Sequence, residues 1–147
     1  MQPTQSHPEL SRLEFLIGKW NTEGHTNATA DTASVKIKGT DTYEWISDGS
    51  FILHTVSVTM GDEQVSNTEI IGYDHEFKRY PMYSFDNSGT VQIMSAEFNP
   101  DGQLVIDGNT MRATLHTNLH ATEMTAHWRL FQNGEWQDWM QVTLSRD

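Results

Sequence analysis

Ten short segments of alternating polar and apolar residues follow one another along the sequence, and Gly, Asn, Asp or Pro stand between them at hairpin spacing. The segments cover residues 19–29, 34–46, 51–60, 65–73, 77–85, 90–98, 103–106, 110–117, 122–131 and 136–145. The gaps between them are too short for the crossover helix that parallel strands need, so the pattern predicts an antiparallel sheet. Because closure removes the exposed edges of such a sheet, we expect an all-β fold, a single antiparallel barrel of about ten strands.

A short apolar segment precedes the first predicted strand. Residues 13–20 read LEFLIGKW, and the stretch 8–17 holds the short helical turn that we expect before the barrel. Gly18 permits a tight turn into the strand, and Trp20 follows it where a large ring can cover the floor of a barrel. The sequence therefore predicts a barrel that is closed at one end by its own N-terminal segment.

The length of the chain limits its organisation. A sequence of 147 residues can close one barrel core but is too short for two domains, so we expect one domain over residues 1–147. No apolar run is long enough to span a membrane as a helix. Residues 1–8 lack the basic start and apolar stretch of a secretory signal, which favours a cytoplasmic protein.

Charge and cysteine content exclude several classes of function. Twenty acidic residues against nine basic ones give a formal net charge of -11, which repels nucleic acid and anionic membrane surfaces. The sequence has no cysteine, so disulfides, thiolate nucleophiles and thiolate metal ligands are excluded. We therefore expect a small-molecule partner, with no nucleic acid and no membrane, for a protein that is a monomer or a homodimer.

Several segments together resemble one family. The segment LIGKW (16–20) is similar to the start of lipocalin-like (calycin) barrels, and GTDTYEW (39–45), GSFILH (49–54), IGYD (71–74) and YSFDNSGT (83–90) resemble the bacterial domain-of-unknown-function family 1579. The resemblance implies a calycin-type barrel and carries no established activity. It also implies that an arginine at the end of the last strand, here Arg146, stacks on Trp20 at the floor. The family pattern has a tryptophan at Ser84, so the serine predicts a roomier or more polar cavity there.

Alternation within each strand indicates which side chains face the interior. Lys36 and Lys38 must face water, which turns Tyr43 and Trp45 inward on the same strand. His54 falls on the apolar face of the next strand, and we expect that face to be the inner one.

Later strands add further interior candidates. The strand that holds Tyr83 and Phe85 has an ambiguous pattern, in which we favour these two side chains as inward. Trp128 shares a face with apolar neighbours. In the last strand, alternation places Trp136 and Asp138 on the same face as Met140, Val142 and Leu144, which we expect to pack in the wall and floor. The predicted ligand-binding residues are therefore Tyr43, Trp45, His54, Tyr83, Phe85 and Trp128, a set that suits a planar or amphipathic ligand.

The histidines are the natural candidates for a metal site. His116 and His120 are four residues apart, and His127 lies on the following strand. Zinc sites usually show tighter spacing with a carboxylate or thiolate partner, so we predict no metal site and no cofactor. A haem held by a single histidine, either His54, His116 or His127, stays open as an alternative.

Known catalytic signatures are absent from the sequence: it has no nucleophile elbow, no P-loop, no dinucleotide glycine motif and no zincin motif. The composition of the interior favours binding of a small apolar or amphipathic molecule. A small barrel enzyme of the isomerase or cyclase type is the alternative, with His54 as base and Tyr43 or Asp41 as acid. A barrel filled by its own side chains, acting as a scaffold, is the third possibility.

Overall fold

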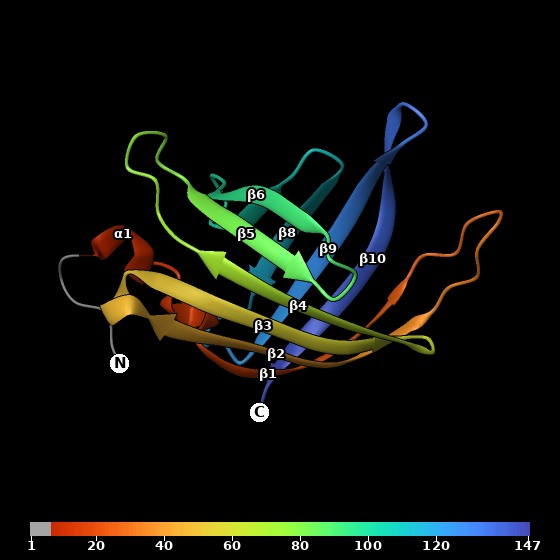
Figure 1. The fold of residues 1–147 in the computed structure, drawn as a ribbon, viewed down its shortest axis with the longest axis horizontal. Coiled ribbons are helices and arrows are strands. Elements are labelled where there is room, and N and C mark those ends of the chain that lie inside the picture. Colours follow the sequence, from red (N-terminus) through yellow and green to blue (C-terminus); the bar gives the residue numbers. More distant parts are fainter. Residues whose placement is uncertain (1–6) are drawn as a thin grey trace.

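The computed structural model describes residues 7–147, which form a closed antiparallel barrel of ten strands (Figure 1). A short helix, α1 (Pro8–Ser11), and a 3-10 turn, η1 (Glu14–Leu16), precede the barrel, and a second 3-10 turn, η2 (Ser47–Gly49), joins two strands. The strands are β1 (Gly18–Thr26), β2 (Lys36–Ile46), β3 (Phe51–Met60), β4 (Glu63–Ile71), β5 (Tyr80–Asp86), β6 (Val91–Phe98), β7 (Leu104–Asp107), β8 (Met111–Thr117), β9 (Glu123–Gln132) and β10 (Glu135–Arg146). The predicted fold class is confirmed. No helix within residues 7–147 is long and apolar enough to cross a membrane.

Each strand pairs with its neighbours in the sequence, and β1 pairs with β10 to close the barrel. The connections therefore alternate between the two ends of the barrel. The N-terminal segment covers the end that holds the β2–β3, β4–β5, β6–β7 and β8–β9 connections (Figure 1). There the hydroxyl of Tyr80 donates to the carbonyl oxygen of Glu9 at 2.7 Å, and the guanidinium of Arg12 lies 4.4 Å from the ring centroid of Phe98. The opposite end of the barrel holds the other connections, which are β1–β2, β3–β4, β5–β6, β7–β8 and β9–β10.

Trp20 and Arg146 build the floor of the barrel. Trp20 has no exposed surface, and its indole N–H donates to the carbonyl oxygen of Leu16 at 2.8 Å. The Arg146 guanidinium lies 4.0 Å from the ring centroid of Trp20 and donates to the carbonyl oxygen of Phe15 at 2.7 Å. Gly18 is required beside them, because its φ is +131° and a Cβ at this position would meet the Arg146 guanidinium. Trp20, near the start of the chain, and Arg146, near its end, therefore hold the N-terminal segment against the barrel.

The fifth strand begins at Tyr80 rather than at residue 77, where the sequence pattern placed it. The side chain of Asp74 accepts the backbone N–H groups of Glu76 and Phe77 at 2.9 and 3.3 Å, and Lys78 adopts a left-handed φ of +55°. A short aspartate side chain that bonds to the following backbone favours a turn over a strand. The segment 74–79 is therefore a tight turn.

A bulge in β10 reverses the expected faces of part of the last strand. The pairing of β10 with β9 shifts between Asp138 and Met140, and this extra residue turns Trp139 toward the interior. Trp136 and Asp138 lie outside, where the Arg112 guanidinium sits 4.1 Å from the Trp136 ring centroid. The prediction that Trp136 and Asp138 share the inner face was wrong, because simple alternation does not allow for an inserted residue.

Candidate functional site

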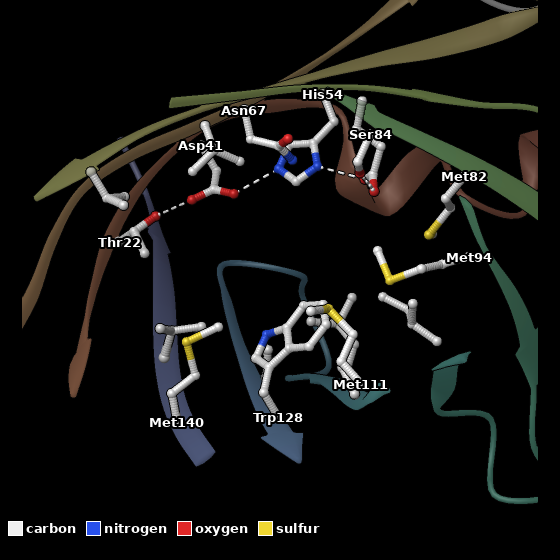
Figure 2. A pocket seen from close by; sticks show the side chains of 18 of the residues that line it. Thr22, Asp41, His54, Asn67, Met82, Ser84, Met94, Met111, Trp128 and Met140 are labelled. Carbon is white, nitrogen blue, oxygen red and sulfur yellow. Dashed lines mark hydrogen bonds and ion pairs between the residues drawn. The ribbon is translucent and has the colours of Figure 1, made fainter. Parts of the chain in front are cut away.

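The barrel encloses a cavity of about 300 Å³, large enough for a small organic molecule. Leu16 forms part of its floor, and side chains from all ten strands line its wall. A cluster of hydrogen-bonded polar side chains occupies one side, while methionine and tryptophan side chains lie across from it (Figure 2). The cavity therefore has two chemically different surfaces.

The strand register brings a row of polar side chains together on β2 to β5. Tyr43 on β2 is opposite His54 on β3, His54 is opposite Glu69 on β4, and Glu69 is opposite Ser84 on β5. Asp41 lies two residues before Tyr43 on the same face of β2, which places it diagonally across from His54. All five side chains line the cavity.

Hydrogen bonds connect five side chains of this wall into one chain, which we call the His54 network: Thr22, Asp41, His54, Glu69 and Ser84 (Figure 2). The ring nitrogens of His54 lie 2.6 Å from Asp41 Oδ2 and 2.9 Å from Glu69 Oε1. The hydroxyl of Thr22 donates to Asp41 Oδ1 at 2.5 Å, and that of Ser84 donates to Glu69 Oε2 at 2.8 Å. Each carboxylate is therefore bonded through both of its oxygens.

The network holds His54 in its protonated form. Burial alone would lower the pKa of His54, but the hydrogen bonds and negative charges of Asp41 and Glu69 outweigh it and raise the pKa to about 9. Both ring nitrogens are then donors, which matches the carboxylate oxygen that faces each of them. At neutral pH neither nitrogen of His54 is free to accept a proton.

Tyr43 covers one face of the His54 ring. The two rings are stacked at a centroid distance of 3.9 Å and an interplanar angle of 7°. Burial, followed by the charges of Asp41 and Glu69, raises the pKa of Tyr43 well above its ordinary value. The phenol therefore keeps its proton, and it shields the charged ring from solvent.

The opposite side of the cavity is apolar and adaptable. Met94, Met111 and Met140 project into it from β6, β8 and β10, and Trp128 lies beside them (Figure 2). Trp139 packs against Trp128 with ring centroids 6.4 Å apart at an angle of 79°. Methionine side chains are flexible and polarisable, so this surface can fit ligands of different outline.

Three of the predicted ligand-binding residues, Tyr43, His54 and Trp128, line the cavity. Trp45 follows Tyr43 on the same face of β2 but is not part of the cavity wall, and it packs against the hydrophobic core. Its indole N–H is buried and has no hydrogen-bond partner among residues 7–147.

The prediction that Tyr83 and Phe85 face inward was wrong. Each residue is 46% exposed, while Met82 and Ser84 of the same strand line the cavity. The inward Ser84 supplies the hydroxyl that Glu69 needs, and the two aromatic side chains lie on the outer surface. There the register sets Tyr83 opposite Ile93 and Phe85 opposite Val91, so each ring has an apolar cross-strand neighbour.

Sequence reasoning missed Glu69, Thr22 and Trp139. The alternation of β4 held a usable signal for Glu69, because it shares a face with the apolar Ile71. Thr22 shares a face of β1 with Trp20, so alternation held a similar signal for it, whereas the bulge concealed Trp139. The expectation of a more polar cavity at Ser84 agrees with the hydroxyl that this residue places there.

The other histidines lie away from the cavity. His116 is exposed near Gln103, and His127 is exposed beside Asp138 on the outer surface of β9 and β10. Neither of them, nor the fully bonded ring of His54, presents a free nitrogen to a haem inside the barrel. Among residues 7–147, no group of three histidine or carboxylate side chains is arranged to hold a metal ion.

Comparison with known proteins places the chain within a family and a fold. The family described as "Protein of unknown function (DUF1579)" matches residues 2–146, which confirms the resemblance seen in the sequence. A search of curated proteins found no significant match.

Two solved structures share the barrel. Rv2717c from M. tuberculosis is 15% identical with a TM-score of 0.73, over 95% of this chain and 98% of that one. The S-type phycobiliprotein lyase CPES from Guillardia theta is 10% identical with a TM-score of 0.65, over 99% of this chain and 98% of the other. At these identities the likeness shows the fold alone.

Proposed function

We propose that this chain, which belongs to the DUF1579 family of proteins of unknown function, binds a small amphipathic molecule inside its barrel. The observation that carries the proposal is a single cavity with two unlike surfaces. The His54 network would hold the polar group of the ligand, and the surface formed by Met94, Met111 and Trp128 would hold its apolar body.

The energetic cost of the His54 network supports a binding role. Asp41, His54 and Glu69 are nearly buried, with side chains 11%, 12% and 8% exposed. Replacing a buried ionic cluster with well-packed apolar side chains is often neutral or stabilising, so such a cluster is weak evidence of a purely structural role. Perturbed ionisable groups inside a cavity are instead typical of functional sites.

Cavity size and the use of the fold by other proteins agree with this role. A volume of about 300 Å³ is at the lower end of the range for small-molecule sites. One similar barrel belongs to a phycobiliprotein lyase, so the fold can serve a protein that acts on another molecule. Both points favour a ligand over a barrel filled by its own side chains.

Catalysis is the second candidate, and the position of His54 between two carboxylates is the observation in its favour. A general base needs a free nitrogen near neutral pH. Here both nitrogens are bonded to carboxylates and the pKa of His54 is raised to about 9. The geometry therefore favours binding over proton abstraction by His54.

Titration with N-phenyl-1-naphthylamine, a neutral dye that brightens in apolar surroundings, tests the proposal. We expect saturable binding with one dye per barrel. The variant Ala113→Phe should weaken the binding by about tenfold or more, because Ala113 lines the cavity and a phenyl group would occupy it. Thr114→Phe is the matched control, since Thr114 follows on β8 and lies outside the cavity wall.

The two variants separate the interior from the outer surface. Loss of dye binding in Ala113→Phe with retention in Thr114→Phe supports an interior site. Equal binding by both variants would show that the dye sits elsewhere. Absence of saturable binding to the unaltered protein, checked by calorimetry, would overturn the proposed function.

A further inference from the structure

We propose that the polar group of the ligand is a cation that carries N–H donors, such as a protonated amine, bound against the carboxylates of Asp41 and Glu69. This inference rests on the proposed function and adds the chemical class of the ligand. Three independent observations carry it: the proton count of the His54 network, the charges around the cavity and the nature of the facing wall.

The proton count fixes the charge of the network. His54 makes two contacts with carboxylate oxygens, and each contact needs one proton between a nitrogen and an oxygen. With both protons on His54, the ring is +1 and the two carboxylates are -2 together. Moving one proton to Asp41 or Glu69 leaves a neutral ring, one neutral acid and one carboxylate. The sum is -1 in every case, so the network is anionic wherever its protons reside.

The hydrogen-bonding sites of the His54 network that remain unused are acceptors. The hydroxyl protons of Thr22 and Ser84 are already donated to Asp41 and Glu69, which leaves lone pairs on these hydroxyl oxygens. The carboxylates also keep lone-pair sites beyond the two bonds that each of them accepts. A ligand that supplies donors satisfies these sites, whereas one that supplies only acceptors does not.

No positive side chain compensates for this charge. Among residues 7–147, neither lysine nor arginine lines the cavity, and the acidic side chain of Asp86 adds a further negative charge beside the β5–β6 turn. The whole chain has a formal net charge of -11. Such a field attracts cations toward the barrel and repels anions from it.

The facing wall accommodates a cation with an apolar body. Trp128 and Trp139 present aromatic surface to the cavity, and aromatic faces attract cations as well as apolar groups. The methionines beside them supply polarisable contacts for a chain or a ring. A free carboxylate on the ligand would meet an anionic network, because the one positive ring in it, His54, already donates both of its N–H groups to Asp41 and Glu69.

Competition among three molecules of equal chain length tests the charge preference. Octylamine, octanol and octanoate are compared at pH 7 for displacement of N-phenyl-1-naphthylamine, with calorimetry as a second readout. We expect octylamine to bind at least about tenfold more tightly than octanol, because a charge-assisted hydrogen bond adds to the same apolar contacts. Octanoate should bind most weakly.

The variant Glu69→Gln tests whether the preference for octylamine over octanol arises at the His54 network. It removes one negative charge from the cavity and keeps the shape of the side chain, so the advantage of octylamine over octanol should shrink toward unity. Glu97→Gln is the matched control, since Glu97 is an exposed carboxylate on β6 and the variant changes the net charge of the chain by the same amount. Asp41→Asn repeats the test at the other carboxylate if Glu69→Gln fails to fold.

Each outcome bears on one proposal or both. Equal binding of the three molecules, or preference for octanoate, overturns the cation inference while dye binding still supports the proposed function. An octylamine preference that persists in both network variants overturns the assignment to Asp41 and Glu69. Failure of the dye and of all three molecules to bind overturns the proposed function and the inference with it.

Discussion

The cavity wall divides into two halves whose inward positions carry different kinds of side chain. On β1 to β5, which we call the polar half, apolar side chains such as Val56 and Ile71 surround a hydrogen-bonded chain of Thr22, Asp41, His54, Glu69 and Ser84. On β6 to β10, the apolar half, the inward positions are mainly Met, Leu, Ala, Val and Trp. The polar half depends on complete pairing, because a buried charge without a partner is costly. The apolar half depends only on contact and area, which tolerate substitution.

The two halves should contribute differently to the choice of a ligand. The apolar half gains free energy from burial without regard to direction. The polar half is directional, since each bond of the His54 network requires a defined strand register. A ligand that spans both halves would be selected by the polar half and held largely by the apolar half.

Removal of His54 should have the largest effect. In His54→Leu the carboxylates of Asp41 and Glu69 lose their shared donor, and we expect the free energy of unfolding at pH 7 to fall by roughly 3 to 5 kcal/mol. The measurement is urea unfolding followed by tryptophan fluorescence.

Met94→Leu is the matched variant in the apolar half, because Met94 is a buried cavity residue and the exchange nearly conserves volume. We expect it to cost less than about 1.5 kcal/mol. A smaller loss in His54→Leu than in Met94→Leu would contradict the view that the polar half is held together by charge.

The pH dependence of stability should show the next largest effect. The pKa of His54 is raised from 6.5 to about 9 on folding, so the stabilisation from this proton is fully present below pH 6.5. It is lost as the pH rises through 9. We expect the advantage of the native protein over His54→Gln to shrink by roughly 2 to 3 kcal/mol across this range.

Urea unfolding of both proteins at pH 6.5, 7.5 and 9 provides the measurement, and the difference between them removes contributions from other titrating groups. Titration of the His54 ring by NMR gives the same transition directly. A constant difference between the two proteins across the range would exclude a protonated His54.

The smallest effects should come from the outer face of β5. Tyr83→Thr and Phe85→Thr each replace a half-exposed ring with a good strand former, and we expect each to cost less than about 1 kcal/mol without changing dye affinity. Met82→Thr, on the inner face of the same strand, should cost about 2 kcal/mol or more and alter dye binding. The reverse order would mean that Tyr83 and Phe85 face the cavity.

The sequence pattern alone was sufficient to predict the barrel. Period-two alternation with turn residues at hairpin spacing specified ten antiparallel strands, because these signals are local and repeat ten times. The segment around Gly18 and Trp20 likewise predicted the closed end. The inward faces of β2 and β3, and with them Tyr43 and His54, followed from lysines that must face water and from an apolar stripe.

Part of the candidate site was decided by tertiary structure alone. The inner face of β5 was ambiguous in the sequence and was decided by its pairing with β4 and β6. The face of β10 changes at a bulge after Asp138, which moves side chains by one position relative to simple alternation. The His54 network depended on register, because Asp41, His54 and Glu69 lie on three different strands and meet only when those strands pair. Sequence thus determined that the chain forms a container, whereas strand pairing determined the charge and hydrogen bonding inside it. The physical reason is that alternation is a property of each strand, while a hydrogen-bonded network requires atoms from several strands within about 3 Å of one another.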